Sequence, residues 1–125
     1  MSSNAQFTTQ TQNPNIPSVT DISIQDVLNN KTKARLIDVR RPDEWTGEFG
    51  HIQGAELMTL DTIPQKINDL NKDDTIVFIC RSGGRSAQAT AFAKQHGFKN
   101  VFNMAGGMIA WTQAGFEVVE QNANR

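Results

Sequence analysis

Thr75-Ile76-Val77-Phe78-Ile79 is followed directly by Cys80-Arg81-Ser82-Gly83-Gly84-Arg85. The apolar run is typical of a strand inside a parallel sheet, because such strands are buried on both faces. The residues after the glycine pair have a helical pattern. The two glycines allow the backbone between the strand and this helix to curl, so that its N–H groups can converge on an anion. This segment therefore predicts a strand, a tight polar loop and a helix, with the only cysteine of the chain where the strand ends.

Cys80 is interpreted as a reactive thiol. At a helix N-terminus it lies near unpaired N–H groups and the positive end of the helix dipole, and Arg81 and Arg85 add positive charge that favours the thiolate. The alternative is a cysteine that only fills the core, which is the usual role of a lone cysteine. A packing residue does not need two adjacent arginines, which are costly beside an apolar site. The context therefore favours a nucleophile.

The composition is that of one ordinary soluble domain. Of the 125 residues, 38% are hydrophobic and 20% are charged, and the net charge is -1. This charge gives no general attraction to nucleic acid or to a membrane, so neither is expected as a partner. A single cysteine excludes an internal disulfide, and a reactive thiol is best kept reduced, so we expect a cytoplasmic protein.

Both ends of the chain are polar. Residues 1–18 contain almost no apolar side chains and include Pro14 and Pro17, so we expect a disordered N-terminal tail. This segment also lacks the basic and apolar regions of a signal peptide. Residues 120–125 are expected to form a polar C-terminal end. A single folded domain is therefore expected over residues 19–119.

Between these ends, strand patterns alternate with helix patterns. Strands are predicted over 36–39, 55–58, 75–79 and 101–104, and helices from Ser23 to Asn30, from Pro42 to about Gly47, from Asp61 or Thr62 through Leu70, from the Cys80 loop to Gly97, and from Gly107 to Ala114. This alternation predicts parallel strands joined by right-handed crossovers, and thus a three-layer α/β/α domain. Ligand sites in such sheets lie beyond the carboxyl ends of the strands, where Cys80 is placed.

Four short segments carry a further pattern. They are Leu36-Ile37-Asp38-Val39-Arg40 with Glu44, Gly50-His51-Ile52-Gln53-Gly54-Ala55, the loop from Cys80 to Arg85, and Gly106-Gly107-Met108-Ile109-Ala110-Trp111 with Gly115. In this order, between Val19 and Val119, they resemble the rhodanese (thiosulfate sulfurtransferase) homology domain in its single-domain form. One departure is Glu117, which stands where the family often has a proline.

The resemblance implies a five-stranded parallel sheet flanked by helices, and a ping-pong sulfur transfer with Cys80 as the nucleophile. A small anionic donor such as thiosulfate gives its outer sulfur to the cysteine, and the persulfide passes it to a thiophilic acceptor such as cyanide. The departing sulfite and the persulfide both carry negative charge that loop amides can stabilise. Neither a cofactor nor a metal ion is expected.

The residues that follow Cys80 are the expected substrate-binding set. They are Arg81, Ser82, Gly83, Gly84, Arg85 and Ser86. A guanidinium presents a planar fork to oxyanions, and Arg85 is the better placed because it lies in the first helical turn, where it could instead brace loop carbonyls. Arg81 could equally point to solvent. Ser82 and Ser86 could donate to the persulfide, or Ser86 could cap local backbone groups. The glycines are expected to provide conformation and N–H groups.

Four polar residues outside the loop are expected to support the site rather than to catalyse. Asp38 follows a buried strand, and Arg40 with Glu44 is predicted to form an ion pair near the end of the sheet. His51, between a glycine and an isoleucine, is predicted to be a hydrogen-bonded loop residue near the site.

Other functions remain open. Phosphatases that resemble this architecture have a loop one residue longer, with arginine where Ser86 stands here, which disfavours phosphate chemistry. Arsenate reduction would need an external thiol, because there is no second cysteine to resolve an intermediate. The domain could also be a carrier that receives persulfide from a protein donor and docks a protein acceptor. By resemblance, the cationic loop favours an anionic inorganic donor over mercaptopyruvate.

Overall fold

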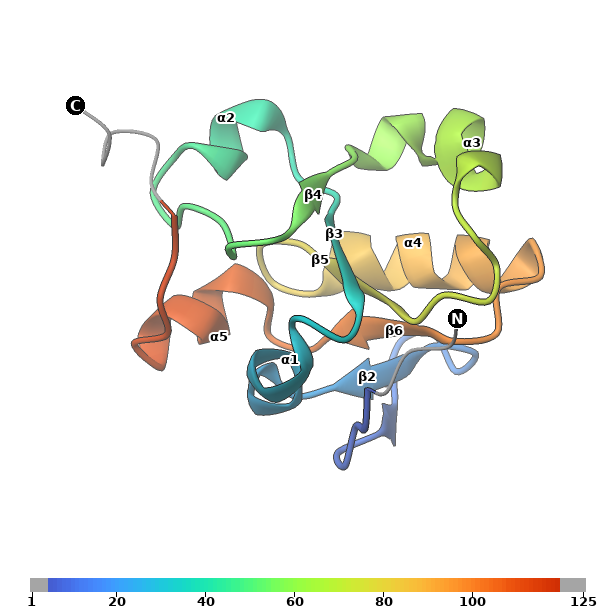
Figure 1. The fold of residues 1–125 in the computed structure, drawn as a ribbon, viewed down its shortest axis with the longest axis horizontal. Helices are drawn as coiled ribbons and strands as arrows, with labels where there is room; N and C mark the ends of the chain where they lie inside the picture. Colours follow the sequence, from blue (N-terminus) through green and yellow to red (C-terminus); the bar gives the residue numbers. More distant parts are fainter. Residues whose placement is uncertain (1–4, 120–125) are drawn as a thin grey trace.

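The computed structural model of the protein describes residues 5–119 and is built around one sheet (Figure 1). The sheet order is β1-β2-β6-β5-β3-β4. The strands are β1 Thr11–Gln12, β2 Thr20–Ile22, β3 Arg35–Asp38, β4 Glu56–Leu57, β5 Ile76–Ile79 and β6 Val101–Met104. The pairs from β2 through to β4 are all parallel, whereas β1 pairs with β2 in the antiparallel direction.

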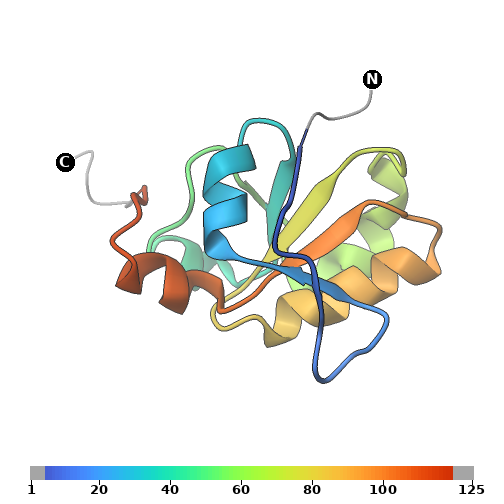
Figure 2. The same ribbon diagram turned by 90° about the horizontal axis from the view of Figure 1, so that it is seen from below.

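Helices cover both faces of the sheet (Figure 2). They are α1 Ile24–Asn30, α2 Pro42–Trp45, α3 Ile63–Lys66, α4 Gly84–Gln95 and α5 Gly107–Gln113, and 3-10 turns Leu60–Thr62 and Ile67–Asp69 flank α3. The predicted three-layer architecture is confirmed. Within residues 5–119, no helix is both long enough and apolar enough to cross a membrane.

The central strand β5 separates two hydrophobic clusters. Ile76 and Phe78 pack with residues of α3 and α4, while Val77 and Ile79 pack with residues of α1 and α5. All four side chains are 0% exposed. Successive residues of a strand point to opposite faces, so a run without polar residues is what a strand between two helical layers requires. The prediction of a buried central strand is confirmed, and it places Cys80 at the carboxyl edge of the sheet.

The helix predicted from Asp61 or Thr62 through Leu70 is broken into short pieces. The Thr62 hydroxyl donates to the Thr59 carbonyl at 2.8 Å and makes no cap hydrogen bond, and Leu70 already has extended backbone angles. By contrast, Ser23 caps α1 as predicted, since its hydroxyl accepts from the Asp26 N–H at 3.1 Å. The apolar spacing of the broken helix still buries Ile63 and Ile67 against the sheet.

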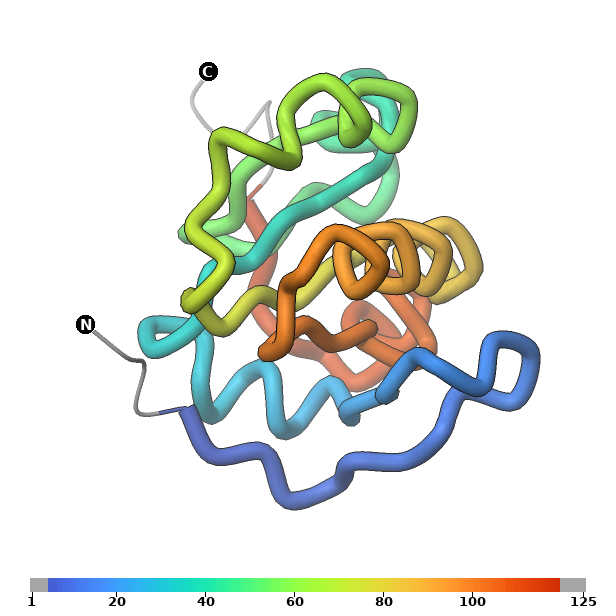
Figure 3. The backbone as a smooth tube through the Cα atoms, turned by 90° about the vertical axis from the view of Figure 1, so that its right-hand side faces the viewer, coloured from blue at the N-terminus to red at the C-terminus, as the bar shows by residue number. Residues whose placement is uncertain are grey.

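Residues 5–18 are not the disordered tail that their composition predicts. Strand β1 adds a sixth strand to the five parallel strands expected, and the blue segment before it runs beside α1 (Figure 3). The Asp26 carboxylate of α1 accepts from the N–H groups of Thr8 and Thr9 at 2.8 and 2.9 Å. Phe7 packs edge-on against Phe102, with ring centroids 4.8 Å apart. Hydrogen bonds to the backbone of this segment hold it in place, and the low content of apolar side chains gives no information about such bonds.

Residues 1–4 of the predicted tail and the predicted polar end 120–125 lie outside the described residues. The order found for the N-terminal segment thus concerns residues 5–18. Asp26 is the residue on which their attachment to α1 is centred. Burial acts to raise the pKa of its carboxyl, but hydrogen bonds from Thr9 and Thr8 outweigh burial and lower the pKa below its usual value.

Asp26→Ala tests this attachment. We expect the Thr8 and Thr9 amides to exchange with deuterium faster than in the native protein, because their acceptor is lost, and the free energy of unfolding to fall by about 2 kcal/mol. Asp43→Ala is the matched control, since this exposed carboxylate contacts only Arg41 across the surface and should leave both readings nearly unchanged. Unaltered exchange at Thr8 and Thr9 in Asp26→Ala would contradict the anchoring role.

Candidate active site

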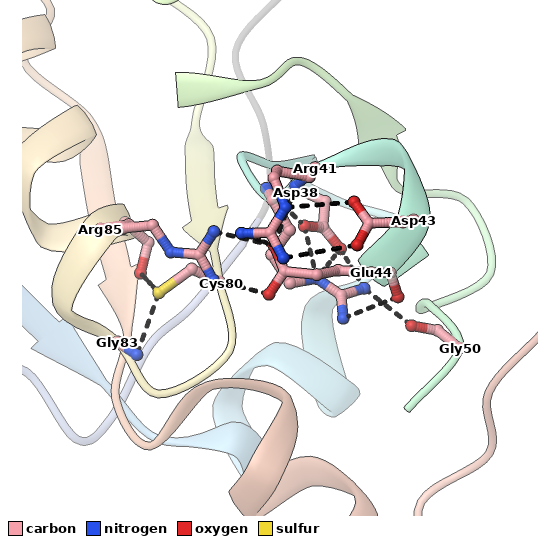
Figure 4. A network of polar contacts seen from close by, with 10 residues as sticks. Asp38, Arg41, Asp43, Glu44, Gly50, Cys80, Gly83 and Arg85 are labelled. Carbon is pink, nitrogen blue, oxygen red and sulfur yellow. Dashed lines mark hydrogen bonds and ion pairs between the residues drawn. The ribbon is translucent and has the colours of Figure 1, made fainter. Parts of the chain in front are cut away.

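Cys80 lies at the carboxyl end of β5, under the loop that leads into α4 (Figure 4). Its side chain is only 1% exposed. The N–H of Gly83 donates to Sγ at 3.0 Å, and the Ser86 hydroxyl lies 3.2 Å from Sγ. The sulfur therefore lies beside the N–H of Gly83 and the hydroxyl of Ser86, at the end of the hydrophobic cluster that contains Phe78.

The loop backbone is turned so that the N–H of Gly83 faces the sulfur. Gly83 has φ +105 and precedes α4, whose first N–H groups have no partner within the helix. On the opposite side, the N–H groups of Met108 and Ile109 in α5 donate to the carbonyls of Cys80 and Arg81 at 2.9 and 3.0 Å. Two loop carbonyls are therefore engaged by α5, while the N–H of Gly83 is directed toward the sulfur.

Gly107 allows α5 to approach the loop this closely. Its φ is +59, and a Cβ there would lie 2.3 Å from the carbonyl oxygen of Arg81 and 2.6 Å from that of Cys80. Any larger residue would push the helix away and break the two hydrogen bonds. The predicted Gly106-Gly107 signature thus acts on the active loop through backbone contact.

Glu44 of α2 pairs with Arg85 of the loop, and not with Arg40 as the sequence predicts. Both guanidinium nitrogens donate to the two carboxylate oxygens at 2.8 Å. The hydrogen bonds from Arg85 lower the pKa of Glu44 to about 2, against the effect of burial and with help from the Arg41 N–H. The hydrogen bonds with Glu44 also raise the pKa of Arg85, against the effect of burial. Arg85 therefore braces the loop against α2.

Arg40 forms its ion pair with Asp38 instead. The two side chains are each 1% exposed, and the guanidinium donates to both carboxylate oxygens, at 2.9 and 2.8 Å. Arg40 also donates to the carbonyls of Gly50 at 2.7 Å and Glu44 at 3.2 Å. The prediction was wrong because Asp38 is two residues away on the same strand end and can be reached without exposing either charge. The buried pair ties β3, α2 and the Gly50 loop together.

The other predicted residues lie around this core. His51 stacks on Trp45 with ring centroids 3.6 Å apart, and its Nδ1 lies 3.0 Å from the Trp45 carbonyl oxygen. Arg81 is exposed, with its guanidinium 5.4 Å from the centre of the Phe49 ring. Ser82 is exposed and lines, with Gly83 and Gly84, a cavity of about 510 Å³ whose other wall includes residues 13–16.

Sequence reasoning missed two buried polar residues behind the thiol. Asn103 of β6 accepts a short hydrogen bond from the Ser86 hydroxyl, and its amide nitrogen donates to Asp21 of β2 at 2.9 Å. Asn103 is 1% exposed and Asp21 is 8% exposed. The sequence feature that could have indicated Asn103 is its position as the one polar residue in the run Val101-Phe102-Asn103-Met104. A buried polar group in a strand needs a partner, and here the partners lead to the active site.

Comparison with known proteins agrees with this geometry. A family model described as "Rhodanese-like domain" matches residues 23–114. The chain belongs to the rhodanese-like domain family. The resemblance carried by the four sequence segments is confirmed, and the rhodanese-like domain contains Cys80 and its loop. Its relatives support a rhodanese-type sulfur transfer as the general activity.

Three relatives illustrate the range of proteins with this domain. A sulfurtransferase of Allochromatium vinosum is 36% identical over 97 residues, covering 78% of this chain and 89% of that protein. The putative sulfur carrier protein YrkF of Bacillus subtilis is 34% identical over 97 residues, covering 78% of this chain and about half, 51%, of that protein. The thiosulfate sulfurtransferase GlpE of Pseudoalteromonas translucida is 31% identical over 102 residues, covering 80% and 95% respectively.

The fold also matches solved structures. A rhodanese-related protein of Thermoplasma volcanium has a TM-score of 0.73 with 31% identity, covering 79% of this chain and 96% of that one. The matched share of this chain is similar in the sequence and structure comparisons. The family model begins at residue 23, so Asp21, β1 and the segment before it lie outside the region it matches.

Gly107→Ala tests the approach of α5 to the loop. We expect a loss of about 3 kcal/mol or more in the free energy of unfolding by denaturant, because the new methyl group overlaps two carbonyls. Gly54→Ala is the matched control, with φ +90 but no atom within 4 Å of its Cβ position. That variant should lose only the backbone strain of about 1–2 kcal/mol. Equal losses in the two variants would contradict a role for close packing.

Glu44→Gln tests the ion pair with Arg85 through its pH dependence. Because the pKa of Glu44 is lowered to about 2 by folding, its stabilisation is full above the unfolded value of about 4.3 and is lost as pH falls through the folded value. The variant should therefore be less stable than the native protein at pH 6, and the gap should shrink between about pH 4 and pH 2. Urea unfolding of both proteins across this pH range measures the difference in their free energies of unfolding. A difference that does not change with pH would contradict the lowered pKa of Glu44.

Proposed function

We propose that the protein is a thiosulfate sulfurtransferase that carries sulfane sulfur as a persulfide on Cys80. The observation that carries the proposal is the placement of Sγ, 3.0 Å from the Gly83 N–H, inside a loop whose carbonyls are bonded to α5. The relative named a thiosulfate sulfurtransferase, 31% identical to this chain, supports thiosulfate as the donor.

The first half-reaction loads the sulfur. Cys80 loses its thiol proton to solvent, and the thiolate attacks the outer sulfur of thiosulfate. A new S–S bond forms to Sγ while the S–S bond of thiosulfate breaks, and sulfite leaves with the electron pair. The negative charge of the persulfide then lies among the loop amides, which is the kind of preorganised donor set that stabilises a developing anion.

The second half-reaction unloads it. A thiophilic acceptor such as cyanide attacks the outer sulfur of the persulfide, forming a C–S bond. The S–S bond to Cys80 breaks, and Sγ takes the electron pair and returns to the thiolate. Thiocyanate leaves, so no cofactor is needed to balance electrons. Such thiol chemistry suits a reducing compartment, and we propose that the protein works in the cytoplasm.

Arg81 and Arg85 are assigned different parts in this reaction. Arg85 is engaged by Glu44 through two 2.8 Å contacts, so we assign it to holding the loop. Arg81 is exposed at the mouth of the loop and has no carboxylate partner among residues 5–119, so we assign it to attracting the donor anion. Ser82, Gly83, Gly84 and Ser86 complete the proposed substrate-binding set. Asp38, Arg40, Glu44 and His51 are assigned supporting roles.

A carrier role is the second candidate, because one relative is named a putative sulfur carrier protein. The same persulfide would then come from a protein donor and pass to a protein acceptor. The short loop disfavours the phosphatase alternative, since Ser86 is buried beside Sγ at the place where a longer loop would need its arginine.

Incubation with thiosulfate followed by intact mass measurement tests the proposal. We expect the native protein to gain one sulfur atom, and cyanide to remove it as thiocyanate. Cys80→Ser is the matched control, since it changes one atom and should gain nothing. Absence of the adduct and of thiocyanate from the folded native protein would refute sulfur transfer from thiosulfate.

Kinetics separate the enzyme from the carrier. A kcat/KM for thiosulfate in the range of about 10⁴ M⁻¹s⁻¹ or above supports the enzyme. A much lower value, together with rapid loading from a cysteine desulfurase, supports the carrier.

A further inference from the structure

A chain of buried polar side chains connects the thiol to the N-terminal segment. The Ser86 hydroxyl lies 3.2 Å from Cys80 Sγ and hydrogen-bonds to Asn103 Oδ1. Asn103 Nδ2 donates to Asp21 Oδ1 at 2.9 Å, and Asn13 Nδ2 donates to the same oxygen at 3.0 Å. All five side chains are at most 8% exposed. Ser86 and Asn103 are at most 1% exposed, so water has little access to the hydrogen bond between them. Asp21 and Asn13 also line the cavity beside Ser82.

The carboxylate of Asp21 fixes the direction of the hydrogen bonds that connect Asn13, Asp21, Asn103 and Ser86. A carboxylate only accepts, so Asn103 must turn its amide N–H toward Asp21. The amide oxygen of Asn103 then faces Ser86, and this oxygen also only accepts. The single hydroxyl proton of Ser86 is therefore committed to Asn103, although Sγ lies within reach of the same hydroxyl. A hydroxyl cannot fully donate to both acceptors.

This direction distinguishes the thiol from the thiolate. When the Ser86 hydroxyl donates its proton to Asn103, the hydroxyl oxygen still has a lone pair facing the sulfur. An S–H group can donate a hydrogen bond to that lone pair, whereas a thiolate has no proton to donate. When Cys80 loses its proton, the Ser86 proton must turn to Sγ to stabilise the charge. That rotation leaves the buried oxygen of Asn103 without its donor, which is costly.

We propose that Asp21 is a positioning residue that acts through Asn103 and Ser86 to hold Cys80 as a thiol until the Ser86 hydroxyl turns. The proposal rests on the proposed function only in taking the Cys80 thiolate as the attacking species. Asp21 is itself held in place by Asn13, whose Oδ1 accepts from the N–H groups of Asn15 and Ile16 at 2.9 Å. The ordered segment that carries Asn13 thus takes part in setting the state of the thiol.

Asn103→Leu provides the decisive variant, because it removes the acceptor for the Ser86 proton and leaves every charge unchanged. Charged groups on the segments around the thiol include Arg81, Arg85, Asp38, Arg40, Glu44 and Asp21, and both variants leave all of them except Asp21 in place. Asp21→Asn is the second variant, since a neutral amide no longer forces the orientation of Asn103. Each is made with Ser86 present and again with Ser86→Ala, which forms a double-mutant cycle.

The measurement is the pH profile of iodoacetamide alkylation, which reads one site because Cys80 is the only cysteine. With Ser86 present, we expect the midpoint to fall by about one pH unit in both variants, which is about a tenfold rise in thiolate at a given pH below the midpoint. In combination with Ser86→Ala, Asn103→Leu should cause no shift, and Asp21→Asn only the smaller shift due to the lost charge. Urea unfolding confirms that each variant is folded.

Three outcomes would overturn the proposal. The first is an unchanged or raised midpoint in Asn103→Leu, and the second is an equal shift with and without Ser86. The third is an unchanged midpoint in Asp21→Asn alongside a shift in Asn103→Leu, which would mean that Asp21 does not set the direction. Alkylation needs no sulfur donor, so these results are independent of whether thiosulfate loads the protein.

Discussion

The carbonyl groups of Cys80 and Arg81 accept hydrogen bonds from the first turn of α5, and the shape of the proposed site depends on this contact. A short loop between a strand and a helix has as many carbonyls as amides, and both could face the ligand. Helix α5 binds the carbonyls of Cys80 and Arg81, while the N–H of Gly83 donates to the sulfur. The contact needs a residue without a side chain, which Gly107 supplies. A segment more than 20 residues downstream thus fixes two of the carbonyls of the loop.

Two ion pairs then order the segments beside the loop, and one of them includes Arg85 of the loop itself. Arg40 and Asp38 are buried together and organise the end of β3, while Glu44 and Arg85 join α2 to the first turn of α4. Neither pair is directed at the thiol as a proton donor or acceptor. They connect backbone segments at the carboxyl edge of the sheet, which agrees with the supporting role proposed for them. Behind the thiol, the hydrogen-bonded side chains of Asn103 and Asp21 connect the site to the N-terminal segment.

Much of the fold could be predicted because its signals are local. Examples are the apolar run before Cys80, the Ser23 cap and the glycines of the loops. Each of these determines the structure of only the few residues around it. The pairing of Arg40 could not be predicted, since Asp38 and Glu44 are both close in sequence and only the packed geometry selects between them. The order of residues 5–18 was missed for a similar reason. Their few apolar side chains gave no sign that Asp26 would bind their backbone.

The sequence by itself determined the layer architecture and the place of Cys80 at the end of a central strand, because periodicity and the position of glycines are properties of neighbouring residues. Tertiary structure decided which carboxylate each arginine binds and which polar groups lie behind the thiol. Asp21 and Asn103 are 82 residues apart and meet only because β2 and β6 pair. Contacts of that kind depend on the register of distant strands, which no local pattern specifies.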